Sequence, residues 1–317
     1  MIINVPTSEG LNDVSLRLHY SAWSSLIGML MEFASLHEQQ GYDVPGSSWQ
    51  DEWKDYLAVS QPHLQATCTV IQQSNELALK SRIAEVSPFL LLLGNDPNFS
   101  AAVKDVDFSE LRTLDAVSLP GAVNSLSAKP VSDSFVSSYN KVRSLRNKIS
   151  HLGTADDNLD PHELLHLLIA QYAELWPNRR WLRDRMTFAA QSPQAHLYDY
   201  KYYSPALEVF NELPFFLALT SKSEFEALIG RKKSTRRYLC FSCFHERSVR
   251  EEGADPASCR MAFLNTSGTN VTCEMCAGDF PVVRVPCNDD GCPGNVLARD
   301  EDGELFCGTC GGSQEPA

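Results

Sequence analysis

Apolar residues recur at helical spacing through the first two thirds of the chain. Residues 13–40 and 64–93 both carry apolar side chains three or four positions apart, which is the pattern of an amphipathic α-helix. We expect the second helix to bend near Pro88, because proline lacks the amide hydrogen that a continuing helix needs. The predicted core face of the first helix consists of Leu16, Tyr20, Trp23, Ile27, Leu30 and Ala34.

Two further helices follow a segment of different amino-acid composition. Residues 94–130 are rich in Ser, Pro, Asp and Gly, and they predict an elaborate loop. The next helix ends at Gly153, a residue suited to a C-terminal cap. Another begins after Asp160, with Pro161 and Glu163 in its first turn, a pattern typical of a capped helix start. The apolar face of the third helix consists of Phe135, Tyr139, Val142, Leu145 and Ile149.

Helical periodicity disappears after the basic segment 231–237. Short β-like runs, such as residues 280–285, then alternate with pairs of cysteines. The predicted fold is therefore mainly α, with an antiparallel helical bundle followed by two small β modules of the zinc-ribbon type. The predicted domains are residues 1–231, 232–280 and 281–317.

Composition and charge narrow the functional class. The chain has 317 residues, 43% hydrophobic and 21% charged, which is ordinary for a soluble globular protein. A net charge of −13 argues against a general nucleic-acid coat protein, although it permits a local phosphate site. Apolar runs such as 89–94 are too short to span a bilayer. The first residues lack a basic stretch followed by an apolar one, so we expect no secretory signal and a cytoplasmic location.

Nine of the ten cysteines lie after residue 239. Such clustering in a chain without a secretory signal indicates metal ligation rather than disulfides. The spacing C-x2-C-x29-C-x2-C is followed by C-x4-C-x14-C-x2-C, and each quartet supplies the four thiolates of a closed, structural Zn²⁺ site. The strands on either side of Asp302-Gly303 strengthen the resemblance of the second quartet to a zinc ribbon. The predicted ligands are Cys240, Cys243, Cys273 and Cys276, then Cys287, Cys292, Cys307 and Cys310.

The surroundings of these cysteines leave some alternatives open. Cys259 or His245 could replace a ligand of the first quartet, and Cys259 could equally be a buried thiol. CxxC pairs with a redox role usually lie next to a βαβ pattern. No such pattern surrounds these pairs, so a redox role is not favoured. Residues 281–317 carry two arginines against seven acidic side chains, so we expect the second ribbon to contact protein rather than phosphate.

The segment HELLH raises the possibility of a zinc-dependent hydrolase. In zinc peptidases two histidines one turn apart hold the metal and the glutamate activates water, and here these residues are His162, Glu163 and His166. The segment falls in the first turn of a helix, and no third histidine follows, although Glu174 is a conceivable ligand. A capped amphipathic helix with two half-exposed histidines explains the same pattern.

The segment RNKISH offers a different chemistry. Arg146, Asn147 and His151 resemble the R-[N/H/D]-x-x-x-H signature of HEPN-family ribonucleases. The earlier segment Asn75–Ile83 is similar to the Glu-x-x-x-Lys helix common in that family, and the resemblance covers about residues 10–180. The chain departs from the family's toxin–antitoxin branch, because no tyrosine follows His151 closely.

The resemblance implies a metal-independent endoribonuclease that acts as a homodimer, in stress response or phage defence. His151 would serve as general acid or base, Arg146 would offset the charge of the transition state, and Asn147 would orient a phosphate or the partner histidine. Arg146 and His151 lie about 140° apart on an ideal helix. They can therefore meet only if the helix breaks at His151 or if two chains share one cleft.

A non-catalytic interpretation remains. Arg and His near the C-terminus of a helix also interact favourably with the helix dipole, so the segment could be a surface helix without catalysis. In that case the chain would be a dimeric interaction module, whose zinc ribbons recruit a protein partner.

Overall fold

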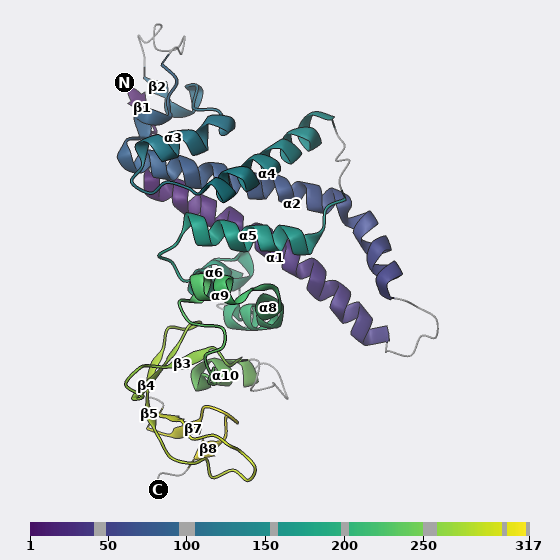
Figure 1. Ribbon diagram of the computed structural model, residues 1–317, viewed down its shortest axis with the longest axis vertical. Coiled ribbons are helices and arrows are strands. Elements are labelled where there is room, and N and C mark those ends of the chain that lie inside the picture. Colours follow the sequence, from purple (N-terminus) through teal and green to yellow (C-terminus); the bar gives the residue numbers. More distant parts are fainter. Residues whose placement is uncertain are drawn as a thin grey trace. The chain divides into compact units, whose positions relative to one another are not determined.

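The computed structural model describes residues 1–40, 49–94, 105–152, 158–197, 203–249, 259–299 and 303–314 (Figure 1). The chain divides into two compact units, Met1–Trp176 and Pro177–Ala317. The sequence instead placed a domain boundary near residue 232. At that point helices give way to strands, but the change falls within the second unit.

The first unit is almost entirely helical. Its two short strands pair in parallel, with Ile2 opposite Val106. The elements in chain order are β1 Ile2–Ile3, α1 Ser8–Gln40, α2 Trp49–Val86, η1 Pro88–Leu91, β2 Val106–Asp107, η3 Phe108–Glu110, η4 Ala116–Ser118, α3 Leu119–Leu126, α4 Asp133–Leu152 and α5 Pro161–Leu175.

Helices α1 and α2 form a long antiparallel hairpin (Figure 1). Ser15 Oγ donates to the carbonyl of Ser74 at 2.7 Å, and Ser74 Oγ donates back to the carbonyl of Ser15 at 2.8 Å. Ser8 and Ser81 repeat this exchange at 3.0 and 2.9 Å. These small side chains let the two backbones approach closely. The predicted face of the first helix is buried except for Ala34, which is half-buried.

Two features of this unit differ from the sequence prediction. Helix α2 begins at Trp49, well before the expected start at residue 64, and it continues through Pro62. Aromatic packing supports its first turns, where Phe33 of α1 lies 4.8 Å from the ring of Trp53. The expected loop 94–130 contains helix α3, whose first turn holds Pro120 and whose buried face includes Val123. Proline suits a helix start, so the loop-like composition was misleading there.

The second unit begins with helices and ends with a sheet. Strands β3 to β8 form a six-stranded antiparallel meander in chain order. The elements are α6 Trp181–Ala190, α7 Pro193–His196, α8 Pro205–Leu219, α9 Lys222–Ile229, α10 Phe241–Ser248, β3 Ala262–Leu264, β4 Asn270–Cys273, β5 Asp279–Val283, β6 Leu297–Arg299, β7 Leu305–Cys307 and β8 Ser313–Gln314.

Strand β5 belongs to both halves of this sheet. It pairs with β4 through Phe280 and Val271, and with β6 through Val282 and Ala298. The ring of Phe241, in α10, lies 4.6 Å from that of Phe280 and stacks 5.4 Å from that of Phe306 in β7. The expected boundary between residues 280 and 281 therefore falls inside a strand that both modules share.

A buried ion cluster joins the helices of the second unit. The side chain of Arg185 on α6 is fully buried, and its Nε donates to Glu212 of α8 at 3.0 Å. The same guanidinium also binds Glu208, which accepts a hydrogen bond from Tyr203. Two carboxylates facing one buried guanidinium supply the charge pairing that burial requires.

The predicted fold class is confirmed: a mainly helical chain ends in small antiparallel modules with two four-cysteine clusters. Among the helices that the structure describes, none is long and apolar enough to cross a membrane.

Candidate functional site

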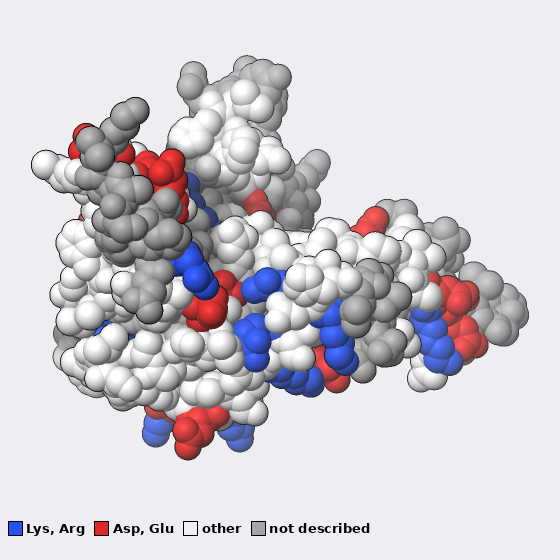
Figure 2. Space-filling model, turned by 90° about the horizontal axis from the view of Figure 1, so that it is seen from above, with Lys and Arg blue, Asp and Glu red and all other residues white. Residues whose placement is uncertain are grey.

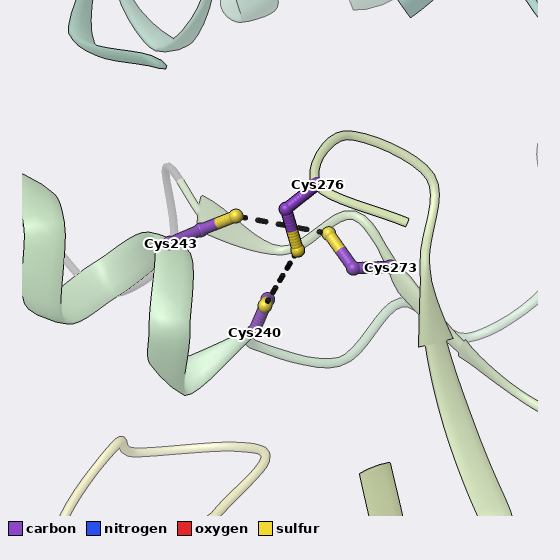
Figure 3. A group of neighbouring side chains, drawn as sticks. All are labelled: Cys240, Cys243, Cys273 and Cys276. Carbon is purple, nitrogen blue, oxygen red and sulfur yellow. Dashed lines mark hydrogen bonds between the residues drawn. The ribbon is translucent and has the colours of Figure 1, made fainter. Parts of the chain in front are cut away.

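The eight predicted metal ligands form two clusters. In the first, the Sγ atoms of Cys240 and Cys276 lie 3.7 Å apart, and those of Cys243 and Cys273 lie 3.8 Å apart (Figure 3). The second repeats these values, with 3.7 Å between Cys287 and Cys310 and 3.8 Å between Cys292 and Cys307. Four sulfurs placed tetrahedrally about 2.3 Å from an ion would lie about 3.8 Å apart.

The later cysteine pair of each cluster sits in the same kind of turn. Ala277 and Gly311 have positive φ angles of 61° and 82°. Their amides donate to the carbonyls of Cys273 and Cys307, at 3.1 and 2.9 Å. Ala277 therefore adopts the left-handed conformation in the first turn. The neighbouring Gly278 is needed for a different reason, since a Cβ there would meet the ring of Phe280 at 2.4 Å.

Backbone amides point at most of these sulfurs. Hydrogen bonds of this kind favour the thiolate form and orient a metal ligand. Each cluster therefore has the donor set, the spacing and the outer hydrogen bonds to hold a metal ion such as Zn²⁺. The amides lie 3.4 Å from the sulfurs in five pairs: Met275 with Cys273, Gly278 with Cys276, Asp289 with Cys287, Gly294 with Cys292 and Thr309 with Cys307.

The two alternative ligands lie outside the clusters. His245 is exposed on α10 and Cys259 is fully buried, and neither belongs to a group of described residues able to share a metal ion. The carbonyl of Cys259 instead accepts the amide of Met261 at 3.1 Å.

The two clusters differ in their surroundings. Three of the first four cysteines are buried, whereas only Cys307 is buried in the second cluster. Beside the first, the buried carboxylate of Glu274 accepts hydrogen bonds from Arg183 and Arg231 at 3.3 and 3.4 Å. Beside the second, Oδ2 of the exposed Asp289 lies 2.9 Å from the sulfur of Cys310. A carboxylate near thiolates disfavours further negative charge, so the two clusters differ electrostatically.

Arg146 of α4 forms an ion pair with the helix that carries the Glu-x-x-x-Lys segment. Its Nη2 lies 2.8 Å from Oε1 of Glu76 on α2. The same oxygen accepts a hydrogen bond from Gln72 at 3.1 Å. Both partners of the ion pair are partly exposed, at 28% for Arg146 and 20% for Glu76. The pair therefore fixes a guanidinium at the surface without removing it from solvent.

A buried tyrosine of α4 lies near this ion pair. Tyr139 is fully buried on α4 and donates to the carbonyl of Ala116 at 2.7 Å. Burial, and then the negative charge of Glu76, raise the pKa of Tyr139 well above its ordinary value. Tyr139 therefore stays neutral and serves as a hydrogen-bond donor that anchors α4.

The remaining motif residues lie on the outer part of the same helix. Asn147 is half-buried and His151 is exposed. Helix α4 runs without a break through His151 to Leu152, and Gly153 lies outside the described residues. One chain therefore does not bring His151 to Arg146 by breaking the helix there.

The exposed side of α4 is rich in positive charge. After Asp133 the helix has no acidic residue. Figure 2 shows Lys and Arg side chains gathered across the middle of the face seen from above, the side on which Figure 1 places α4. The basic residues of the helix are Lys141, Arg143, Arg146 and Lys148.

The HELLH residues form a helix start. Oδ1 of Asp160 accepts the amides of His162 and Glu163 at 2.7 and 3.4 Å. His162, Glu163 and His166 are all exposed, and they are not among the groups of described residues that could share a metal ion. Glu174 instead accepts the amide of Ser132 at 2.6 Å. The geometry matches the capped amphipathic helix that the sequence offered as the other explanation.

A scan against models of protein families gave no match for this chain, and searches of curated proteins and of solved structures gave none either.

Proposed function

We propose that the helical unit is a metal-independent endoribonuclease whose site is formed by Arg146, Asn147 and His151. The ion pair between Arg146 and Glu76 carries this proposal. It joins the two segments on which the resemblance to HEPN ribonucleases rests, one on α4 and one on α2. The ion pair orients a partly exposed guanidinium and offsets part of its charge, so a phosphate at this site would compete with Glu76 for the N–H donors of Arg146.

Each residue has a chemical role in the proposed reaction. His151 removes the proton of a ribose 2′-hydroxyl, whose oxygen attacks the adjacent phosphorus, or it protonates the departing 5′-oxygen. Arg146 stabilises the negative charge that develops on the phosphate oxygens. The bond between phosphorus and the 5′-oxygen breaks, which leaves a 2′,3′-cyclic phosphate and a 5′-hydroxyl. The 2′-hydroxyl is the nucleophile, so DNA is not a substrate.

We propose that two chains build each cleft. His151 and Arg146 face different directions on one continuous helix, so a second copy must bring a complementary residue. The lysines and arginines of α4 would attract the RNA backbone, although the whole chain is acidic. Zn²⁺ is the proposed ion of both cysteine clusters, where it would be structural, and the proposed setting is the cytoplasm.

Cleavage of single-stranded RNA by the purified chain tests this proposal. EDTA should leave the activity in place, and the products should carry 2′,3′-cyclic or 3′-phosphate ends. His151→Ala should reduce cleavage by at least a hundredfold without changing thermal unfolding, because a general acid or base contributes about 10² to 10⁴ in rate. His166→Ala is the matched control, since His166 is an exposed histidine of the same unit.

The possible outcomes separate the alternatives. Loss of cleavage in His166→Ala, or in EDTA while both cysteine modules stay folded, would favour the hydrolase interpretation of HELLH. No cleavage of any RNA by the wild-type chain would favour the dimeric interaction module. If two chains share each site, a mixture of Arg146→Ala and His151→Ala chains should regain activity that neither variant has alone.

A further inference from the structure

Arginines gather at the turn of the second cysteine cluster. Nη2 of Arg236 donates to Oγ1 of Thr309 at 3.1 Å, and Nη2 of Arg260 donates to the carbonyl of Thr309 at 2.7 Å. The guanidinium of Arg236 also lies over the ring of Tyr238, 5.2 Å from its centroid. Two segments far from Thr309 in the sequence therefore bring positive charge to one turn.

A third guanidinium completes this group. Arg237 is half-buried and lies close enough to Arg260 for the two positive charges to repel each other. Burial, and then this repulsion, lower the pKa of Arg237. We call Arg236, Arg237 and Arg260 the arginine patch.

The arginine patch differs from four ion-paired arginines of the same unit, although Arg180, Arg284 and Arg299 also have no ion pair with the described residues. Arg179, Arg183, Arg185 and Arg231 each lie within ion-pair distance of a carboxylate. In the described part of the chain, no carboxylate lies that close to any member of the patch. The chain has 40 acidic residues against 27 basic ones, so three neighbouring arginines with no carboxylate partner among the described residues are unexpected.

Two nitrogen atoms of the patch also lack hydrogen-bond partners. Nη1 of Arg237 and Nε of Arg260 are both buried, and neither donates to an atom of the described residues; Nε of Arg183 and Nη1 of Arg185 share this property but belong to ion-paired guanidinia. A buried donor without an acceptor costs free energy, and such donors commonly mark a water or an ion that completes the site. The free donors, together with positive charge that no described carboxylate offsets, favour an acceptor that is itself negative.

We propose that Arg236, Arg237 and Arg260 form a binding site for a phosphate group. A guanidinium presents a planar fork of N–H donors that matches the oxygens of phosphate, and neighbouring guanidinia can share one dianion. The phosphate can be a free ion or part of a single-stranded RNA backbone. This site lies in the sheet unit and does not depend on the proposed nuclease activity.

One other negative partner is available within the chain. A metal ion held by four thiolates carries a net negative charge, and Thr309 stands between two of the ligands, Cys307 and Cys310. If the patch served only that cluster, its removal would weaken metal binding and leave phosphate binding unchanged.

The test uses the full chain with His151→Ala, which prevents cleavage by the proposed site. Binding of a fluorescent single-stranded uridine oligonucleotide is measured by anisotropy between 50 and about 300 mM salt, with inorganic phosphate as competitor against chloride at equal ionic strength. The arginine variant is Arg237→Gln with Arg260→Gln. The control is Arg179→Gln, because Arg179 is neutralised by Asp184. The metal content of every variant is measured by elemental analysis.

The double variant should bind the oligonucleotide about tenfold more weakly at 0.1 M salt. The slope of log K against log salt should fall in magnitude by about 0.7 for each lost phosphate contact, whereas the control should keep both values. If phosphate protects the chain from unfolding but the oligonucleotide slope is unchanged, the ligand is a free phosphate ion.

Unchanged binding of both ligands in the double variant would overturn the proposal, and so would a loss of metal as its only effect. Should the double variant fail to fold, Arg237→Lys with Arg260→Lys preserves the charge. That variant should keep the salt slope but bind more weakly, because lysine lacks the planar fork. Equal affinity for the lysine variant would also contradict the proposed geometry.

Discussion

The α1–α2 hairpin and the β3–β8 sheet are stabilised in different ways. Tyr20, Trp23 and Leu26 on α1 are almost completely buried, as are many other apolar side chains of the helical unit. The strands of the sheet have only two to five residues. One of their core clusters consists of Leu297, Leu305 and Cys307, with other cysteines packed against it. In the core of the sheet, metal ligands thus take the place of the large apolar side chains that fill the core of the helical unit.

Metal removal should affect the sheet and the helical unit most differently. The purified chain should contain two Zn²⁺ ions, and chelation should unfold the sheet, because a structural zinc site contributes roughly 10 kcal/mol or more to such small modules. The helical circular dichroism of the first unit should persist. Elemental analysis and limited proteolysis check both statements. A sheet that resisted protease after metal loss would show that its apolar contacts suffice.

A core substitution in the helical unit should have the opposite pattern. Trp23→Ala should lower the free energy of unfolding by about 3 to 5 kcal/mol, because Trp23 is fully buried. The metal content should stay at two ions per chain. Val59→Ala is the control, since Val59 is 83% exposed and its loss should change stability by less than about 0.5 kcal/mol. Urea unfolding followed by helical signal provides the measurement.

Acid should weaken the helical unit through His19. This residue is fully buried among the rings of Tyr20, Tyr172 and Trp176, and burial lowers its pKa to about 3. The unfolded chain binds a proton near its ordinary pKa, whereas the folded chain does not. The contribution of neutral His19 to the free energy of unfolding is therefore complete above about pH 6.5. It is lost as pH falls toward 3, by about 1.4 kcal/mol per pH unit.

The variant His19→Phe should remove most of this pH dependence, because a phenyl ring fills the aromatic site and takes up no proton. Urea unfolding of the helices at pH 7 and pH 5 makes the comparison. Equal slopes in both proteins would assign the acid sensitivity to other groups.

The smallest effect is expected at Asp289, where the two cysteine clusters differ. Its carboxylate lies 2.9 Å from the sulfur of Cys310 and 3.6 Å from that of Cys287. Asp289→Asn should slow metal release from the second cluster a fewfold, since it removes a negative charge next to thiolates. Asp290→Asn is the matched control. Competition with a colorimetric chelator measures the rates, and faster release would reverse the inferred sign.

Local pattern predicted some features well and others poorly. The cysteine quartets could be assigned from spacing, because each pair needs only one tight turn to present two sulfurs. Helix α3 was missed because Pro120 and nearby polar residues resemble a loop. The contact between Arg236 and Thr309 joins residues 73 positions apart and has no local signature. The charge count of residues 281–317 was therefore incomplete, because arginines from earlier in the chain pack against that module.

The candidate nuclease site was only partly predictable. Arg146 and the segment Asn75–Ile83, which contains Glu76, were both noted in the sequence, but the ion pair between them depends on how α4 crosses α2. Tyr139 was expected only as a core residue. Its hydrogen bond to Ala116 depends on the segment that looked like a loop.

Because β5 pairs with strands of both halves of the sheet, it also affects how the two cysteine modules could be inherited. A strand bonded on both edges cannot be assigned to one repeat, so recombination after residue 280 would leave each fragment with an open edge. Phe241 would stay with Phe280 in the first fragment and would lose the stacking contact with Phe306. The two cysteine clusters are therefore expected to be inherited together as one domain, and not as two separable modules.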